Sequence, residues 1–147
     1  MMKTPIYSLL LVLALAPLAL ALDSNDLGII PSPKEIRLGR AAMPLVRDGK
    51  PVATIVLAGG PCRQAEIGAD EINEQVESLC GVRLPVKSEA QLTAADSGAP
   101  WVVLGLLADL RMKFALTDAA TVPQGYQIRF VSGKALLVGC DPLGLLY

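Results

Sequence analysis

The chain contains no histidine, and this absence removes several classes of enzyme from consideration. A serine or cysteine nucleophile that depends on a histidine base cannot be activated without that base. A zinc site is also disfavoured, because the three cysteines lack C-x-x-C spacing and no imidazole is present to complete the ligand set. The sequence therefore predicts neither a metal site nor histidine-dependent catalysis.

Charge and aromatic side chains are also scarce. The chain has 13 Lys and Arg against 14 Asp and Glu, and aromatic residues make up 4% of its 147 residues. Without a basic patch, neither nucleic acid nor a membrane surface is an expected partner. The Ala58-Gly59-Gly60 segment lacks the Gly-Lys-Ser/Thr of a phosphate-binding loop. We expect it to be a plain strand-to-helix turn and predict no cofactor.

The cysteines are too few and too far apart for a disulfide framework. Cys62 and Cys80 bracket a predicted helix, which would separate them by roughly 25 Å at about 1.5 Å per residue. A disulfide requires Cα atoms within about 7 Å, so this pair is excluded if the helix forms. Pairing of Cys140 with one of them stays open, while the simpler expectation is that all three are small buried apolar residues.

Residues 1–21 have the features of a secretory signal peptide. Lys3 precedes an uncharged run from Ile6 to Leu20, and Ala19-Leu20-Ala21 forms a cleavage site after Ala21. An uncleaved N-terminal anchor is the alternative, but the run is short for a bilayer span. We expect export to the periplasm or the extracellular space, no membrane attachment after cleavage, and one domain over residues 22–147.

The pattern of the remaining chain predicts an α+β fold with a mixed sheet and two packed helices. The expected order is β-β-α-β-β-α-β-β, ending in a β-hairpin. Strands are expected at 35–38, 52–57, 84–86 (at a sheet edge), 101–105, 126–130 and 135–138. Helices are expected at 63–79, with an apolar stripe of Ala65, Ala69, Ile72, Val76 and Leu79, and more weakly at 106–116. Gly81 should end the first helix, and Asp48-Gly49 and Ser132-Gly133 should form turns.

No catalytic, cofactor-binding or metal-binding residue is predicted. Glu66, Asp70, Glu74 and Glu77 lie on one helix face opposite the apolar stripe, which is typical of a solvated surface rather than a pair of glycosidase acids. Asp96, Asp109, Asp118 and Asp141 fall at loop or cap positions. Trp101, Tyr126, Phe130 and Tyr147 are alternatives for a sugar-stacking platform, although core packing is the preferred interpretation because three of them lie on predicted strands.

The order of these segments resembles the N-terminal domain that precedes the catalytic barrel in exported glycoside hydrolases of the α-glucuronidase and β-N-acetylhexosaminidase kinds. The matching pieces are Ile30-Pro-Ser-Pro33, the 69–79 helix, Cys80–Val86, Trp101–Gly105, Gly125–Phe130 with Leu136–Gly139, and Gly144–Tyr147. The resemblance implies a non-catalytic domain whose partner is a C-terminal barrel of the same protein, and it carries over no catalytic residue. The apolar residues Leu143, Leu145, Leu146 and Tyr147 are accordingly expected to form a sticky patch in this chain alone.

Two other functions remain open at this point. A free-standing module that binds carbohydrate or another surface would require exposed aromatic rings. An independent small enzyme is disfavoured by the missing histidine and the scattered acids.

Overall fold

A computed structural model describes residues 33–37, 39, 42–60, 62–116 and 122–146. The chain divides into two units, Met1–Arg37 and Leu38–Tyr147. In the first unit the described residues 33–37 contain no helix or strand, and an ion pair joins Arg37 to Glu35. The predicted signal peptide lies outside the described residues. The second unit carries the fold.

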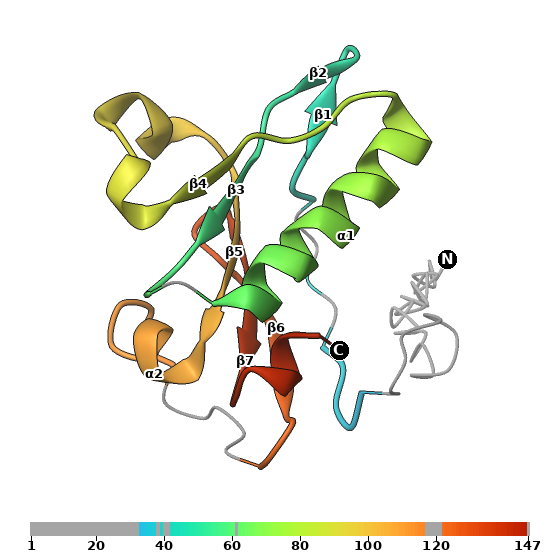
Figure 1. Ribbon diagram of the computed structural model, residues 1–147. Coiled ribbons are helices and arrows are strands. Elements are labelled where there is room, and N and C mark those ends of the chain that lie inside the picture. Colours follow the sequence, from blue (N-terminus) through green and yellow to red (C-terminus); the bar gives the residue numbers. More distant parts are fainter. Residues whose placement is uncertain (1–32, 38, 40–41, 61, 117–121, 147) are drawn as a thin grey trace, which may run out of the picture. The chain divides into compact units, whose positions relative to one another are not determined.

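A five-stranded mixed sheet forms the centre of this second unit (Figure 1). Its strands are β3 (Thr54–Leu57), β4 (Val86–Ser88), β5 (Trp101–Leu106), β6 (Tyr126–Val131) and β7 (Lys134–Gly139). The order across the sheet is β4-β3-β5-β7-β6. All neighbouring pairs are parallel except β6 and β7, which form an antiparallel hairpin with Val131 opposite Lys134.

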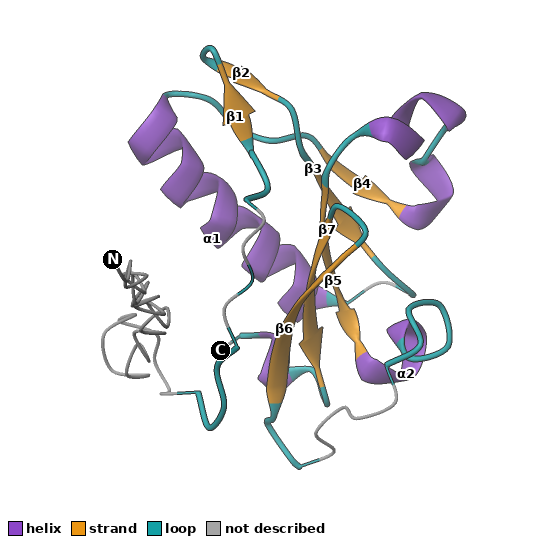
Figure 2. Ribbon diagram, turned by 180° about the vertical axis from the view of Figure 1, so that it is seen from behind, coloured by secondary structure: helices purple, strands orange, loops and turns teal. Residues whose placement is uncertain are grey.

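Both faces of the central strands are buried, which explains their continuous apolar sequence. Helix α1 (Arg63–Cys80) covers one face and packs on Ile55, Val102 and Leu104. The opposite face is covered by the short helix α2 (Leu107–Leu110) and the turns after it, which pack on Val56, Val103 and Leu136. Figure 2 shows the two helices on either side of the sheet. The predicted α+β class, with a mixed sheet and two packed helices, is confirmed.

The sequence placed several boundaries correctly. The α1 helix ends at Cys80, and Gly81 follows in the left-handed conformation at φ 71°, with its N–H bonded to the Glu77 carbonyl. Strand β4 lies at the edge of the sheet, as predicted, but it spans Val86–Ser88 rather than 84–86, so Pro85 lies just before it. The Ser132-Gly133 turn has positive φ at both residues, which is the geometry of a tight two-residue hairpin.

The first predicted strand is wrong. Residues 35–37 contain no strand, and Leu38 lies outside the described residues. Instead, the Asp48-Gly49 turn joins two short strands, β1 (Val46–Arg47) and β2 (Lys50–Pro51), which pair with each other and not with the main sheet. Alternation over four residues is too weak a signal when tertiary pairing decides where a strand forms.

The second predicted helix is much shorter than expected. After α2 the chain turns at Ala115, where φ is +50°, and the Leu116 N–H bonds the Arg111 carbonyl. This reversal brings Phe114 and Leu116 back onto the sheet. Burying Phe114 and Leu116 therefore stabilises the chain more than a longer α2 helix would.

Two short 3₁₀ helices, η2 (Glu89–Gln91) and η3 (Ala94–Gly98), lie at the start of and within the segment 91–100 that is expected to be a surface loop. A third, η4 (Leu143–Leu145), follows β7. In η4 the Leu145 side chain packs against the core cluster under α1, whereas Leu143 and Leu146 are 48% and 44% exposed. The predicted sticky patch is thus only partly present among the described residues, because Leu145 already contributes to the core.

Candidate functional site

The acidic face of α1 is a solvated surface, as predicted. Glu66, Asp70, Glu74 and Glu77 are all exposed. Arginines neutralise three of them: Arg63 Nη1 lies 3.3 Å from Glu66, and Arg83 lies 2.8 Å from Glu77 and 3.7 Å from Asp70. A general acid needs a desolvated carboxyl group. All four carboxylates of this row are exposed to solvent and three are paired with arginine, which is not the environment that raises the pKa of a general acid.

The main chain of the glycine turn after β3 is hydrogen-bonded by the side chain of Glu89. The Gly59 N–H donates to Glu89 Oε2 at 3.1 Å, and Lys113 Nζ lies 2.6 Å from the same oxygen. The Lys113 ammonium and the Gly59 N–H together lower the pKa of Glu89. The glycine segment lies between β3 and α1, as predicted, and its Gly59 N–H is bonded to the Glu89 carboxylate.

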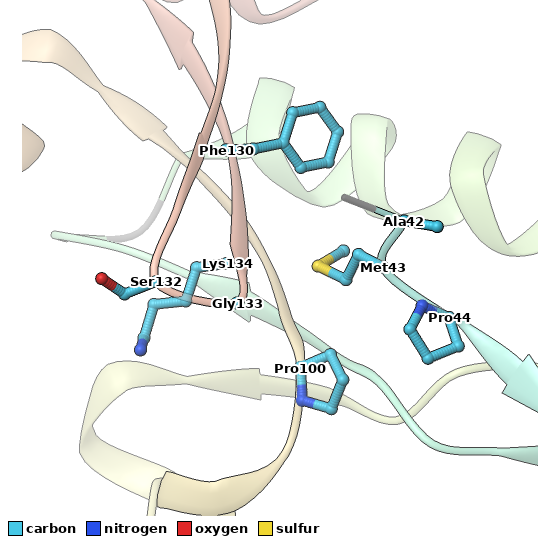
Figure 3. Close-up of a pocket in the computed structure, with 8 residues that line it drawn as sticks. All are labelled: Ala42, Met43, Pro44, Pro100, Phe130, Ser132, Gly133 and Lys134. Atoms are coloured by element: carbon cyan, nitrogen blue, oxygen red, sulfur yellow. The ribbon is translucent and has the colours of Figure 1, made fainter. Parts of the chain in front are cut away.

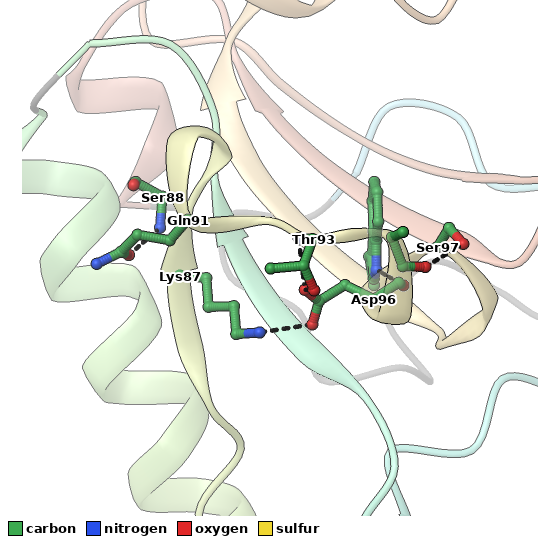
Figure 4. A network of polar contacts seen from close by, with 8 residues as sticks. Lys87, Ser88, Gln91, Thr93, Asp96 and Ser97 are labelled. Carbon is green, nitrogen blue, oxygen red and sulfur yellow. Dashed lines mark hydrogen bonds and ion pairs between the residues drawn. The ribbon is translucent and has the colours of Figure 1, made fainter.

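A polar network organises the segment between β4 and β5 (Figure 4). The Asp96 carboxylate accepts bonds from Lys87 Nζ at 2.6 Å and from the Thr93 N–H at 2.7 Å and hydroxyl at 2.8 Å. The Trp101 indole N–H donates to the Asp96 carbonyl at 2.8 Å. Lys134 Nζ lies 4.6 Å from the centroid of the Trp101 ring, within cation–π range. The network stabilises the loop and holds the Trp101 ring, which is partly buried against the core on the α2 side of the sheet.

Because of this network, the free energy of unfolding should depend on pH in the acidic range. The Lys87 ammonium, followed by the Thr93 donors, lowers the pKa of Asp96 from 3.8 to about 2. A group with a depressed folded-state pKa stabilises the protein above its unfolded pKa, and that contribution is lost as pH falls through the folded pKa. We expect Asp96→Asn to lose less stability than the native chain between about pH 4 and pH 2. Thermal unfolding measured across that window tests this, and parallel curves for the two proteins would contradict it.

The other predicted loop aspartates have different environments. Asp141 caps η4, because its carboxylate accepts from the Gly144 N–H at 2.9 Å and from the Gln124 N–H at 2.8 Å. These donors, Gln124 first, lower the pKa of Asp141. Asp109 lies in the first turn of α2 rather than in a loop, and Asp118 lies outside the described residues.

No disulfide joins the three cysteines, all of which lie in the described part of the chain. Cys62 and Cys140 are partly buried, but Cys80 is exposed at the end of α1, so the expectation that all three are buried is wrong for Cys80. Burial raises the pKa of the Cys140 thiol, with a smaller contribution from Asp141. None of the described residues form a cluster of three or more His, Cys, Asp or Glu side chains suited to a metal ion.

Phe130 contradicts the expectation of core packing for the aromatics. Its side chain is 71% exposed, while Trp101 and Tyr126 are partly buried and Tyr147 lies outside the described residues. Phe130 lies beside Met43, Pro44 and Pro100 at a shallow pocket of about 260 Å³ (Figure 3). The Ser132 and Lys134 side chains point away from this pocket, so its accessible side chains are apolar.

Phe130 belongs to a larger apolar surface on the α1 side of the sheet. Residues opposite one another in the hairpin share a face, so Phe130 and Ile128 lie on the same face as Ala135 and Leu137. Leu137 also lines a groove of about 430 Å³ between α1, β5 and η4. We define the open apolar surface as the exposed side chains Ile128 and Phe130 together with the groove residues Ile67, Ile72, Leu137, Leu145 and Leu146.

The sequence did not reveal this surface, because alternation shows that two faces of a strand differ but does not show which one is covered. Helix α1 packs on β3 and β5, and among the described residues it leaves the corresponding face of β6 open. The described residues thus bring together an apolar surface that spans β6, β7 and the groove beside α1.

In the part of the chain that the structure describes, no helix combines the length and apolar character needed to cross a bilayer. Comparison with known proteins found no matching family model and no matching curated protein.

Proposed function

We propose that this chain is a non-catalytic N-terminal accessory domain of an exported glycoside hydrolase, and that the catalytic barrel of the same protein packs against it. The observation that carries the proposal is the open apolar surface. Ile128 and Phe130 are 49% and 71% exposed on the same face as Leu137, which lines the groove beside α1, and Leu146, 44% exposed, lines that groove too. A contiguous exposed apolar surface is typical of a site where another protein surface docks.

The placement of the acids supports the same proposal. The hydrolysis of a glycosidic bond needs two carboxyl groups on either side of the bond, one of them desolvated. In the described residues two partly exposed carboxylates, Asp96 and Glu89, are held by lysine partners that stabilise their ionised forms. A catalytic centre would therefore lie in the partner barrel, and this domain would contribute packing.

We expect the purified chain to show no hydrolysis of aryl glycosides of glucuronic acid or N-acetylglucosamine above background. The protein recovered from the export compartment should be used, with intact mass checking whether it begins at Leu22. Matched assays of Glu66→Ala and Asp70→Ala should give the same baseline. Turnover that disappears in either variant would overturn the proposal, as would a stop codon directly after Tyr147 in the gene.

A free-standing carbohydrate-binding module is the second candidate, favoured by the exposed ring of Phe130. In that case oligosaccharides should bind the chain, and Phe130→Ala should abolish binding while Met112→Ala, at a site 88% exposed, should not. Calorimetric titration with uronic-acid and N-acetylhexosamine oligomers separates this candidate from the first.

A further inference from the structure

The α1 face of the sheet has room for one more helix. Helix α1 packs on β3 and β5, and among the described residues the same face of β6 stays open, with Ile128 49% exposed. Because neighbouring strands lie about 4.8 Å apart, β7 and β6 together present a face about 10 Å wide beside α1. A helix with its side chains is about 10 Å across, and packed helices lie about 8–10 Å apart. The width of this face therefore matches a single helix.

The groove of about 430 Å³ beside α1 has the chemistry of a helix-binding site. Glu71 is the one charged residue among the described residues that line it. This carboxylate is exposed, and it takes part in none of the ion pairs of the described chain. The walls are otherwise mainly apolar, formed by Ile67, Ile72, Leu104, Leu137, Leu145 and Leu146. The groove thus suits apolar side chains with a cation at their edge.

A capped helix start lies beside this groove. The Asp141 carboxylate accepts from the Gly144 N–H at 2.9 Å, the bond that an N-cap residue makes three positions ahead. Pro142 follows at the first helical position, where proline is favoured. Pro142 and Leu146, on either side of η4, both have right-handed helical backbone angles. Leu145 packs into the core and Leu146 lines the groove, so a helix that continues from η4 begins in the groove itself.

We propose that the groove is filled by an amphipathic α-helix that continues from η4 and joins this domain to the barrel. The proposal rests on the proposed function, in which the barrel follows this domain in the same protein, and it names the element that enters the groove. The helix packs beside α1, its apolar stripe covers Leu137, and a lysine or arginine at the edge of the stripe pairs with Glu71. By helical periodicity the stripe continues at positions i+4, i+7, i+8 and i+11 from Leu145.

The first test uses the protein with its own continuation. The reading frame after Tyr147 should encode large apolar residues at those four positions, with polar residues between them and a lysine or arginine among these. Proline within this stretch, or polar residues at the four positions, would overturn the helix and leave the barrel proposal intact. A stop codon there overturns the barrel proposal as well.

A second test adds a designed extension of about 15 residues, long enough to form a helix when it is packed. One version carries leucine at the four positions. The control has the same composition with each leucine moved by two positions, which turns the stripe by roughly 200°. The midpoint of thermal unfolding should rise by at least about 5 °C with the first version and stay unchanged with the control, because the leucines are buried only when they face the groove. Binding of an apolar fluorescent dye should fall in the first version alone.

Two lysine substitutions check that the groove itself holds the helix. Ile67→Lys places a charge in the groove and should cancel the gain from the leucine extension. Met112→Lys, at a site 88% exposed outside the groove, should keep the gain. Circular dichroism of both variants without the extension checks that they are folded.

Two outcomes of these measurements would overturn the helix. One is an equal gain from the two extensions. The other is a native chain that binds no dye, because its own residues or a second copy in a stable dimer already cover the groove, and sedimentation velocity distinguishes these two cases. The glycoside assays do not involve the groove, so failure of the helix and failure of the proposed function give different results.

Discussion

Replacing Asn73 with alanine should lower the free energy of unfolding by about 2–4 kcal/mol. Asn73 is 2% exposed in the middle of α1, and its amide makes two bonds to one residue. Nδ2 donates to the Leu84 carbonyl at 3.1 Å, and Oδ1 accepts from the Leu84 N–H at 2.7 Å. Alanine would leave both main-chain groups buried without partners, and it would break the link between the helix and the segment that leads into β4.

Chemical denaturation of Asn73→Ala beside Glu74→Ala measures this effect. Glu74 is the next residue of the same helix and is exposed, so its substitution should change the stability by less than about 0.5 kcal/mol. Asn73→Asp adds a sharper comparison, because the carboxyl group keeps the acceptor and loses the amide donor. Burial beside the Leu84 carbonyl should raise the pKa of that carboxyl, so the variant should become less stable as pH rises. Equal stability of the Asn73 and Glu74 alanine variants would contradict the role of the amide.

Replacing Gly144 with alanine should also be strongly destabilising, by about 2–3 kcal/mol. Gly144 is buried in η4, and a Cβ atom there would overlap the Gly125 carbonyl oxygen and approach the Gln124 carbonyl carbon at 3.3 Å. Both obstacles are main chain and cannot rotate away. The shift that relieves them would pull the Gly144 N–H from Asp141 and move Leu145 out of the core.

Gly98→Ala is the matched control, because a Cβ atom at Gly98 meets nothing within 4 Å and its φ is not positive. In thermal unfolding, the midpoint temperature of Gly98→Ala should equal that of the native chain, and the midpoint of Gly144→Ala should be well below both.

The packing of η4 also corrects the expectation that residues 143–147 form only an exposed apolar patch. Removing residues after Asp141 should destabilise the domain, and a truncated chain with native stability would show that η4 contributes nothing.

The sequence predicted those parts of the fold that local physics decides. The α1 period, the left-handed Gly81, the Ser132-Gly133 turn and the apolar run of β5 each depend on residues close in the chain. The errors have a tertiary origin. Leu79 matched the apolar stripe but is 81% exposed, and Asn73, absent from that stripe, is buried because Leu84 supplies both of its partners.

The candidate site was harder to predict for the same reason. Phe130 is exposed because α1 packs on β3 and β5 and not on β6. The position of a helix on a sheet is a tertiary property, so the residues around Phe130 could not predict it. The absence of a histidine-dependent centre followed directly from composition. The sequence alone could thus exclude some catalytic mechanisms. The open apolar surface could be identified only from the folded structure.

The strand order has a consequence for the timing of folding during synthesis. Strand β7 is the last strand to be made, yet it lies inside the sheet between β5 and β6. Until Gly139 has left the ribosome, β5 has a partner on one side only and β6 has none in the sheet. Long-range parallel pairing forms slowly even when all strands are present. This domain of the nascent chain therefore stays open until the residues of β7 have been made, although four of its five sheet strands are complete before then.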